Sequence, residues 1–145
     1  TSDVDITIEE VLDADAILDY QRLVRQVEVS SAAQDYAVRL VMSTHPGGEL
    51  ATAQVNSYFR FGASPRAAQT LVLAAKVGAL LDGRSSLQPD DIKAVVLPAM
   101  RHRCLINFEA EAEGLSTDHL IGKILDEVPE VEGRVARELS TYLLG

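Results

Sequence analysis

The sequence has little of what a disulfide, a membrane span or a nucleic-acid surface requires. Its single cysteine, Cys104, cannot form an internal disulfide, so we expect a reducing, cytoplasmic location. No apolar run approaches the roughly 18 residues of a membrane-spanning helix, and the first residues do not resemble a signal peptide. Only three lysines occur, and 22 acidic against 13 basic residues give a net charge of −9. Binding to nucleic acid is therefore not expected, because phosphate contacts need clustered Lys and Arg.

Catalytic motifs are also lacking. A P-loop needs Gly-x4-Gly-Lys-Ser/Thr, whose backbone amides cradle phosphates. The only Gly-Lys pair is Gly122-Lys123, with Thr117 in place of the first glycine and Ile124 in place of Ser/Thr. The pair also lies inside a helical pattern, so this sequence holds no P-loop. Asp126-Glu127 faintly resembles the acidic pair that holds magnesium in such ATPases, but its helical surroundings favour the end of an amphipathic helix.

No metal site is expected. His45, His102 and His119 are widely separated, and none has a second ligand at the usual spacing. Cys104 follows Arg101-His102-Arg103, whose charge could lower the pKa of a thiol, but apolar Leu105 and Ile106 favour a buried, inert cysteine.

Helical periodicity recurs along the whole chain, which fits one domain of 145 residues. We predict an all-α fold, a small bundle of about five or six helices. The helices are expected to start near Asp13, Ser31, Ser64-Pro65, Pro89 and Ser116, with a last amphipathic helix in the tail from Val131 to Tyr142.

Three features qualify this pattern. Residues 3–8 alternate and form either a connector or a short edge strand. His45-Pro46-Gly47-Gly48 opens a predicted loop of roughly fifteen residues. The helix from Ser64 to about Asp82 is apolar around most of its circumference and is predicted to be the central, buried one, ending at Gly83; Pro98 is predicted to kink or end the helix that starts at Pro89.

An ordered set of motifs resembles the helical lid of MoxR-type AAA+ ATPases, which are related to the ATPase subunits of magnesium chelatase. Gly-Ala-Ser-Pro-Arg-Ala at residues 62–67 resembles their "sensor 2" segment. The likeness continues through Leu-Leu-Asp-Gly-Arg at 80–84, Gln-Pro-Asp-Asp-Ile at 88–92, Leu-Pro-Ala-Met-Arg-His-Arg at 97–103 and Phe-Glu-Ala-Glu-Ala-Glu-Gly at 108–114. It covers roughly residues 12–129.

The resemblance implies three parts. Residues 1–12 would be a linker from an ATPase core that this sequence does not include, 13–129 the lid, and 130–145 a helical C-terminal extension. The parent protein would bind ATP and Mg²⁺, assemble into a ring, commonly a hexamer, and remodel an unknown client protein. The lid alone would be inactive, and neither ATP nor Mg²⁺ is expected to be bound to it.

The resemblance also assigns residues. Arg66 would be the sensor 2 arginine that reaches the ATP phosphates, with Ser64 and Pro65 beside it; the alternative is a solvated arginine on a polar stripe. For Arg101, His102 and Arg103, contact with a neighbouring subunit and a local salt bridge to the acidic run at 109–113 stay equally open.

A different class of function is a stand-alone helical module that binds another protein without nucleotide. Its docking surfaces would be the long loop before Ser64 and the apolar tail. It explains the lack of a P-loop but not the ordered motifs. A self-contained enzyme is disfavoured, because no catalytic constellation is present.

Overall fold

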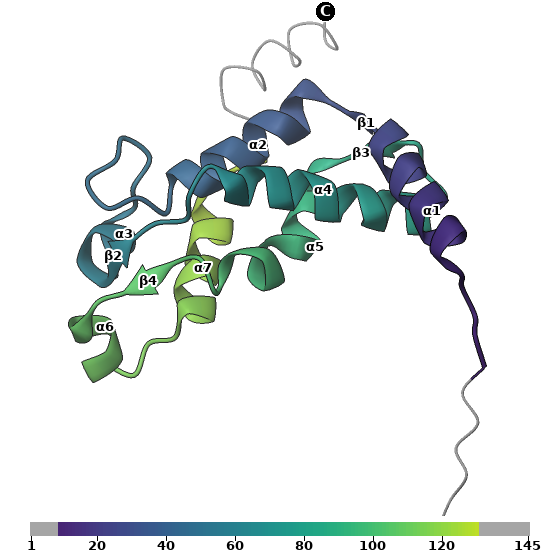
Figure 1. The fold of residues 1–145 in the computed structure, drawn as a ribbon. Coiled ribbons are helices and arrows are strands. Elements are labelled where there is room, and N and C mark those ends of the chain that lie inside the picture. Colours follow the sequence, from purple (N-terminus) through teal and green to yellow (C-terminus); the bar gives the residue numbers. More distant parts are fainter. Residues whose placement is uncertain (1–8, 131–145) are drawn as a thin grey trace, which may run out of the picture.

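The computed structural model describes residues 9–130, which form a helical bundle with two very short sheets at its edges (Figure 1). The helices are α1 (Ala14–Gln26), α2 (Ser31–Met42), α3 (Ala53–Tyr58), α4 (Arg66–Leu81), α5 (Pro89–Met100), α6 (Phe108–Ala112) and α7 (Thr117–Glu127). The strands are β1 (Glu28–Val29), β2 (Phe59–Phe61), β3 (Ser86–Leu87) and β4 (Leu105–Ile106). The predicted all-α bundle is confirmed, with seven helices in these residues instead of about five or six. The alternating residues 3–8 and the tail from Val131 lie outside the described residues.

Local side-chain chemistry sets most helix ends. The Asp13 carboxylate accepts the Ala16 amide at 2.7 Å, which confirms the predicted start of α1. Ser116 caps α7 and Pro89 is the first residue of α5, both as predicted. For α2 the predicted cap was one residue late, because the hydroxyl that accepts the Ala33 amide belongs to Ser30.

Helix α4 runs through the centre of the bundle and packs against α1, α2 and α5 (Figure 1). One side of it is fully buried, through Ala67, Leu71, Ala75 and Ala79. Helix α4 is the central helix, as predicted, but it is not buried on all sides: Leu73 is 54% exposed, because the neighbouring helices leave that side of α4 uncovered. The predicted stop is confirmed, since Gly83 has the left-handed φ of +74° that follows many helix ends.

The segment after His45 is not a continuous loop, contrary to the prediction. It contains α3, which the Thr52 hydroxyl caps by accepting the Val55 amide at 3.2 Å, and then β2. Burial of Val55 stabilises this short helix beyond what its own sequence gives. Strand β2 pairs antiparallel with β4, with Phe59 opposite Ile106.

Pro98 does not end α5, which continues to Met100. Proline removes one backbone hydrogen bond. The burial of Ala99 and Met100 in the core compensates for that loss by holding the last turn in place.

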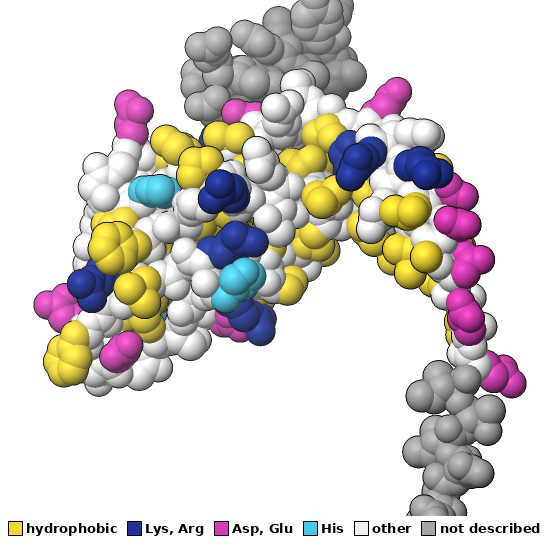
Figure 2. Space-filling model, in the orientation of Figure 1, with side chains coloured by type: hydrophobic (Ala, Val, Ile, Leu, Met, Phe, Trp, Pro, Cys, Tyr) yellow, Lys and Arg dark blue, Asp and Glu magenta, His cyan; other side chains and the backbone are white. Residues whose placement is uncertain are grey.

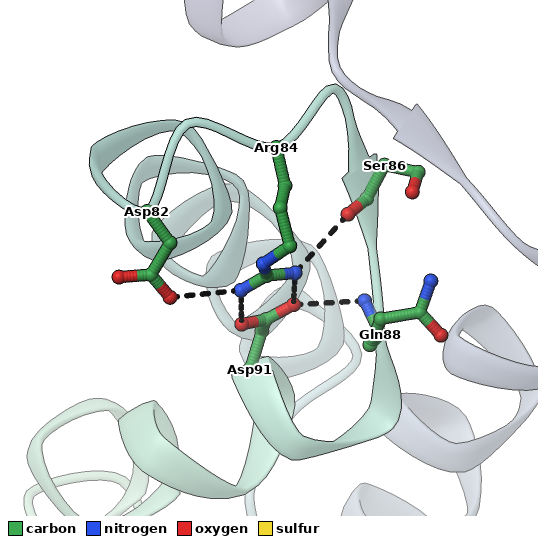
Figure 3. Close-up of polar contacts among 5 residues, drawn as sticks. All are labelled: Asp82, Arg84, Ser86, Gln88 and Asp91. Atoms are coloured by element: carbon green, nitrogen blue, oxygen red, sulfur yellow. Dashed lines mark hydrogen bonds and ion pairs between the residues drawn. The ribbon is translucent and has the colours of Figure 1, made fainter.

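An ion-pair cluster closes the corner between α4 and α5 (Figure 3). The Arg84 guanidinium donates to both carboxylate oxygens of Asp91, at 2.8 and 2.5 Å, and also to Asp82 at 2.9 Å. The Asp91 carboxylate in turn accepts a hydrogen bond from the backbone amide of Gln88 at 2.8 Å and so caps α5. The cluster fixes the direction in which α5 leaves α4.

Helix α1 lies at one edge of the bundle (Figure 1), and none of its residues is buried. The apolar side chains of Ile17 and Tyr20 are exposed, and Val27, just beyond the helix, is buried in the core. A two-residue parallel pairing of β1 with β3 attaches the end of α1 to the α4–α5 corner. None of the helices within residues 9–130 is long and apolar enough to cross a membrane.

Candidate functional site

The backbone leading into α4 is fixed against the end of α2. The Thr44 hydroxyl accepts the Ala63 amide at 2.9 Å, and the His45 ring donates from Nε2 to the Ala63 carbonyl at 2.8 Å. Gly62 passes so close that a Cβ there would lie 2.6 Å from the Thr44 carbonyl oxygen. Only glycine fits such an approach, so these contacts define where α4 begins.

Helix α4 starts one residue later than predicted. Pro65 is the capping residue and Arg66 the first helical one, and no side chain caps this end. The predicted Ser64 hydroxyl cap was wrong: the Ser64 carbonyl, not its hydroxyl, accepts the Ala67 amide, at 2.8 Å. Proline already fixes the backbone angle needed to enter the helix, which explains why the hydroxyl is not required.

Arg66 projects from this first turn into solvent. Within residues 9–130 no carboxylate lies within 4.0 Å of its guanidinium, and the first turn of α4 contains no acidic residue. Ser64 and Pro65 beside it are exposed as well. An unpaired guanidinium at the positive end of a helix dipole is chemically suited to an anion.

A second arginine, from a distant part of the sequence, reaches the next turn of α4. The Arg103 Nε donates to the Ala99 carbonyl at 2.9 Å, and its Nη2 donates to the Thr70 hydroxyl at 3.4 Å. That hydroxyl donates to the Arg66 carbonyl at 2.9 Å. Thr70 therefore joins Arg66 on α4 to Arg103 beyond α5. Figure 2 shows dark-blue and cyan side chains gathered in this region, over the start of α4 and the end of α5.

The neighbouring residues of the Arg-His-Arg segment face solvent. Arg101 pairs with Asp118 at the start of α7, at 2.9 Å. The alternative of a local salt bridge to the acidic run at 109–113 was thus wrong for Arg101. The fold brings Asp118 of α7 next to Arg101 instead. Glu113 from that run instead accepts a hydrogen bond from Tyr58, at 2.8 Å. His102 is exposed.

Cys104 lies beneath this surface and is buried, as predicted. Burial raises the pKa of its thiol to about 11, although contacts with the Ala63 backbone and the Thr44 hydroxyl act in the opposite direction. The cysteine anchors the turn that carries Arg103 to the backbone before α4. In the described part of the chain, no group of three His, Cys, Asp or Glu residues is placed to hold a metal ion.

The sequence of this chain matches a known protein family. Residues 51–124 match the family described as "AAA lid domain". The chain belongs to the AAA lid domain family. The match contains both the start of α4 and the Arg-His-Arg segment.

Relatives place the lid in the MoxR type. The chain is 32% identical to the chaperone MoxR1 of Mycobacterium tuberculosis over 83% of its own length and 32% of that protein. It is 31% identical to the protein MoxR of Methylorubrum extorquens over 88% of its length and 40% of that protein. The crystal structure of a candidate ATPase from Cytophaga hutchinsonii superposes with a TM-score of 0.75 and 36% identity, over 79% of this chain and 35% of that one. The lid thus spans about a third of the length of these proteins.

The lid brings together two candidate segments that the sequence analysis treated separately. Arg66 and Arg103 are 37 positions apart, and their link through Thr70 has no local sequence signal. Thr44 and His45, which position the backbone before Arg66, were also missed as parts of the site. His45 was considered only as a metal ligand. The helix-breaking Pro-Gly-Gly sequence at 46–48 that follows it gives no sign of its contact with Ala63.

Proposed function

We propose that this lid serves an ATPase, in which Arg66 contacts the phosphates of ATP bound by a nucleotide-binding core of the same polypeptide. Mg²⁺ would accompany the nucleotide in that core. The observation that carries the proposal is the unpaired Arg66 guanidinium on the first turn of α4, with no acidic residue in that turn. A guanidinium offers a planar fork of donors that suits phosphate oxygens.

The rigid setting of Arg66 supports this role. Contacts of Thr44 and His45 with Ala63 fix the backbone three residues before it. Because the backbone is fixed, only the side chain of Arg66 has to be ordered when an anion binds. Loss of the γ-phosphate on hydrolysis would remove part of the attraction, so the position of the lid would follow the state of the nucleotide. That coupling would drive remodelling of a client protein.

Ring assembly belongs to the same proposal. Lids of this type would contact the neighbouring subunits of a ring, commonly a hexamer, and the exposed Arg101 and His102 are candidates for such contacts. We expect the whole protein to act in the cytoplasm.

Replacement of Arg66 in the full-length protein tests the role in hydrolysis. Arg66→Ala is expected to lower ATP turnover at least about tenfold, because removal of one donor to a developing anion commonly has an effect of this size or larger. The lid should stay folded, since Arg66 is exposed. Arg60→Ala is the matched control: Arg60 is exposed on β2, where it stacks on Phe61, and its loss should leave turnover unchanged. Turnover of the Arg66 variant within about twofold of the parent would overturn the assignment.

A further inference from the structure

Directed hydrogen bonds hold Arg103 against the face of α4 that carries Arg66. Its Nε donates to the last-turn carbonyl of Ala99 and its Nη2 to the Thr70 hydroxyl, at 2.9 and 3.4 Å. Thr70 lies one helical turn after Arg66, so the two side chains share one face of α4. Helical side chains lean toward the N-terminus, which directs this face toward the start of α4.

The donor capacity of Arg103 is only partly used. A guanidinium carries five N–H groups, and two of them have the partners named above. In the described chain no carboxylate lies within 4.0 Å of Arg103 or of Arg66. The same holds for Arg25 and Arg60, whereas Arg22, Arg39, Arg84 and Arg101 each have one. Acidic residues are plentiful in a chain of net charge −9. Like charges on one face of a helix repel each other, and an anion that contacts both would offset that repulsion.

We propose that Arg103 is a second phosphate-binding residue and holds, together with Arg66, the same polyphosphate chain of a nucleoside triphosphate. The Thr70 contact places the Arg103 Nη2 on the face of α4 that carries Arg66, and two guanidinium forks can bind more than one phosphate oxygen each. This inference rests on the proposed contact between Arg66 and ATP.

Equilibrium binding to the full-length protein tests it, with a non-hydrolysable ATP analogue and with ADP. Arg66→Gln and Arg103→Gln are each expected to weaken binding of the analogue about tenfold and binding of ADP less, as loss of a charge-assisted hydrogen bond predicts. The loss of affinity in the double variant should be smaller than the product of the two single-variant losses, because both arginines contact one ligand. Arg60→Gln is the matched control, since Arg60 is exposed on β2, stacks on Phe61 and should not change affinity for either nucleotide.

Arg103→Lys separates phosphate binding from a structural tie between α4 and α5. Lysine keeps the charge but cannot keep both the Ala99 and the Thr70 contacts. For a phosphate ligand, affinity of the lysine variant should lie between those of the parent and Arg103→Gln. Equal loss of affinity in both variants, in step with a lower melting temperature, would overturn the inference.

The outcomes at the two arginines are distinguishable. If Arg66→Gln weakens binding and Arg103→Gln does not, the inference fails and the proposed function stands. If neither weakens binding, the proposed function fails with it.

Discussion

Arg84 and Asp91 form a two-pronged ion pair that joins the end of α4 to the start of α5, with the Asp91 side chain almost fully buried. Hydrogen bonds from Arg84 are the main reason that the pKa of Asp91 lies below its usual value; the Gln88 amide adds to this, and burial opposes it. The ionised carboxylate is therefore stabilised by the fold. This pair links folding stability to pH.

Asp91→Asn is expected to lower the free energy of unfolding at pH 7 by about 2 kcal/mol, because the amide cannot accept both Arg84 donors. The pKa of Asp91 is lower in the folded chain than its unfolded value of about 3.9. The stability that this carboxylate contributes is therefore fully present above about pH 3.9 and is lost as the pH falls through the folded pKa. The difference in free energy of unfolding between variant and parent should thus become smaller below about pH 4. Urea unfolding across this range measures it. Asp19→Asn, in an exposed pair with Arg22, is the control and should have little effect; a gap that stayed constant with pH would contradict the mechanism.

Gly62→Ala is expected to destabilise the chain by about 2 kcal/mol, the usual effect of forcing an extra methyl group into a filled space. Its Cβ would lie 2.6 Å from the Thr44 carbonyl oxygen. Gly78→Ala is the matched control within α4, where a Cβ meets nothing within 4 Å. That change should stabilise by up to about 1 kcal/mol, because alanine is the better helix former. Thermal unfolding of both variants measures the difference, and equal melting temperatures would show that the backbone of residue 62 shifts freely.

Cys104 is expected to react slowly with a thiol reagent while the chain is folded. A pKa raised from 9.0 to about 11 leaves only a small thiolate population at pH 8. That population is about a hundredfold smaller than at an ordinary cysteine, and burial slows access further. Reaction with an aromatic disulfide, followed by absorbance, should accelerate at least about a hundredfold when urea unfolds the chain. Similar rates with and without urea would contradict the buried position.

Short-range chemistry accounts for what the sequence predicted well. Asp13, Pro89, Ser116 and Gly83 mark helix ends through contacts within a few residues, and all four are found as predicted. The start of α4 was displaced by one residue, because a serine hydroxyl and a proline both favour helix starts and sequence alone does not rank them.

Tertiary packing accounts for the rest. Helix α3 was predicted as loop because six residues carry too little periodicity, and burial of Val55 is what stabilises it. Leu73 and Val77 on the exposed side of α4 are as apolar as the residues on its buried side, so only the placement of its neighbours shows that they face water. At the site, Arg66 was identified through its motif, but the bond from Arg103 to Thr70 depends on how α5 crosses α4.

Helix α4 also has a mechanical consequence. Its sixteen residues form a rod about 24 Å long, with Arg66 at one end and the Arg84 corner just beyond the other. The pairing of β1 with β3 fastens α1 to that far corner. A rotation of the rod by about 5° around its Arg66 end would therefore move the far end, and α1 with it, by about 2 Å. A small change of orientation at the charged end of α4 would therefore become a larger displacement of α1.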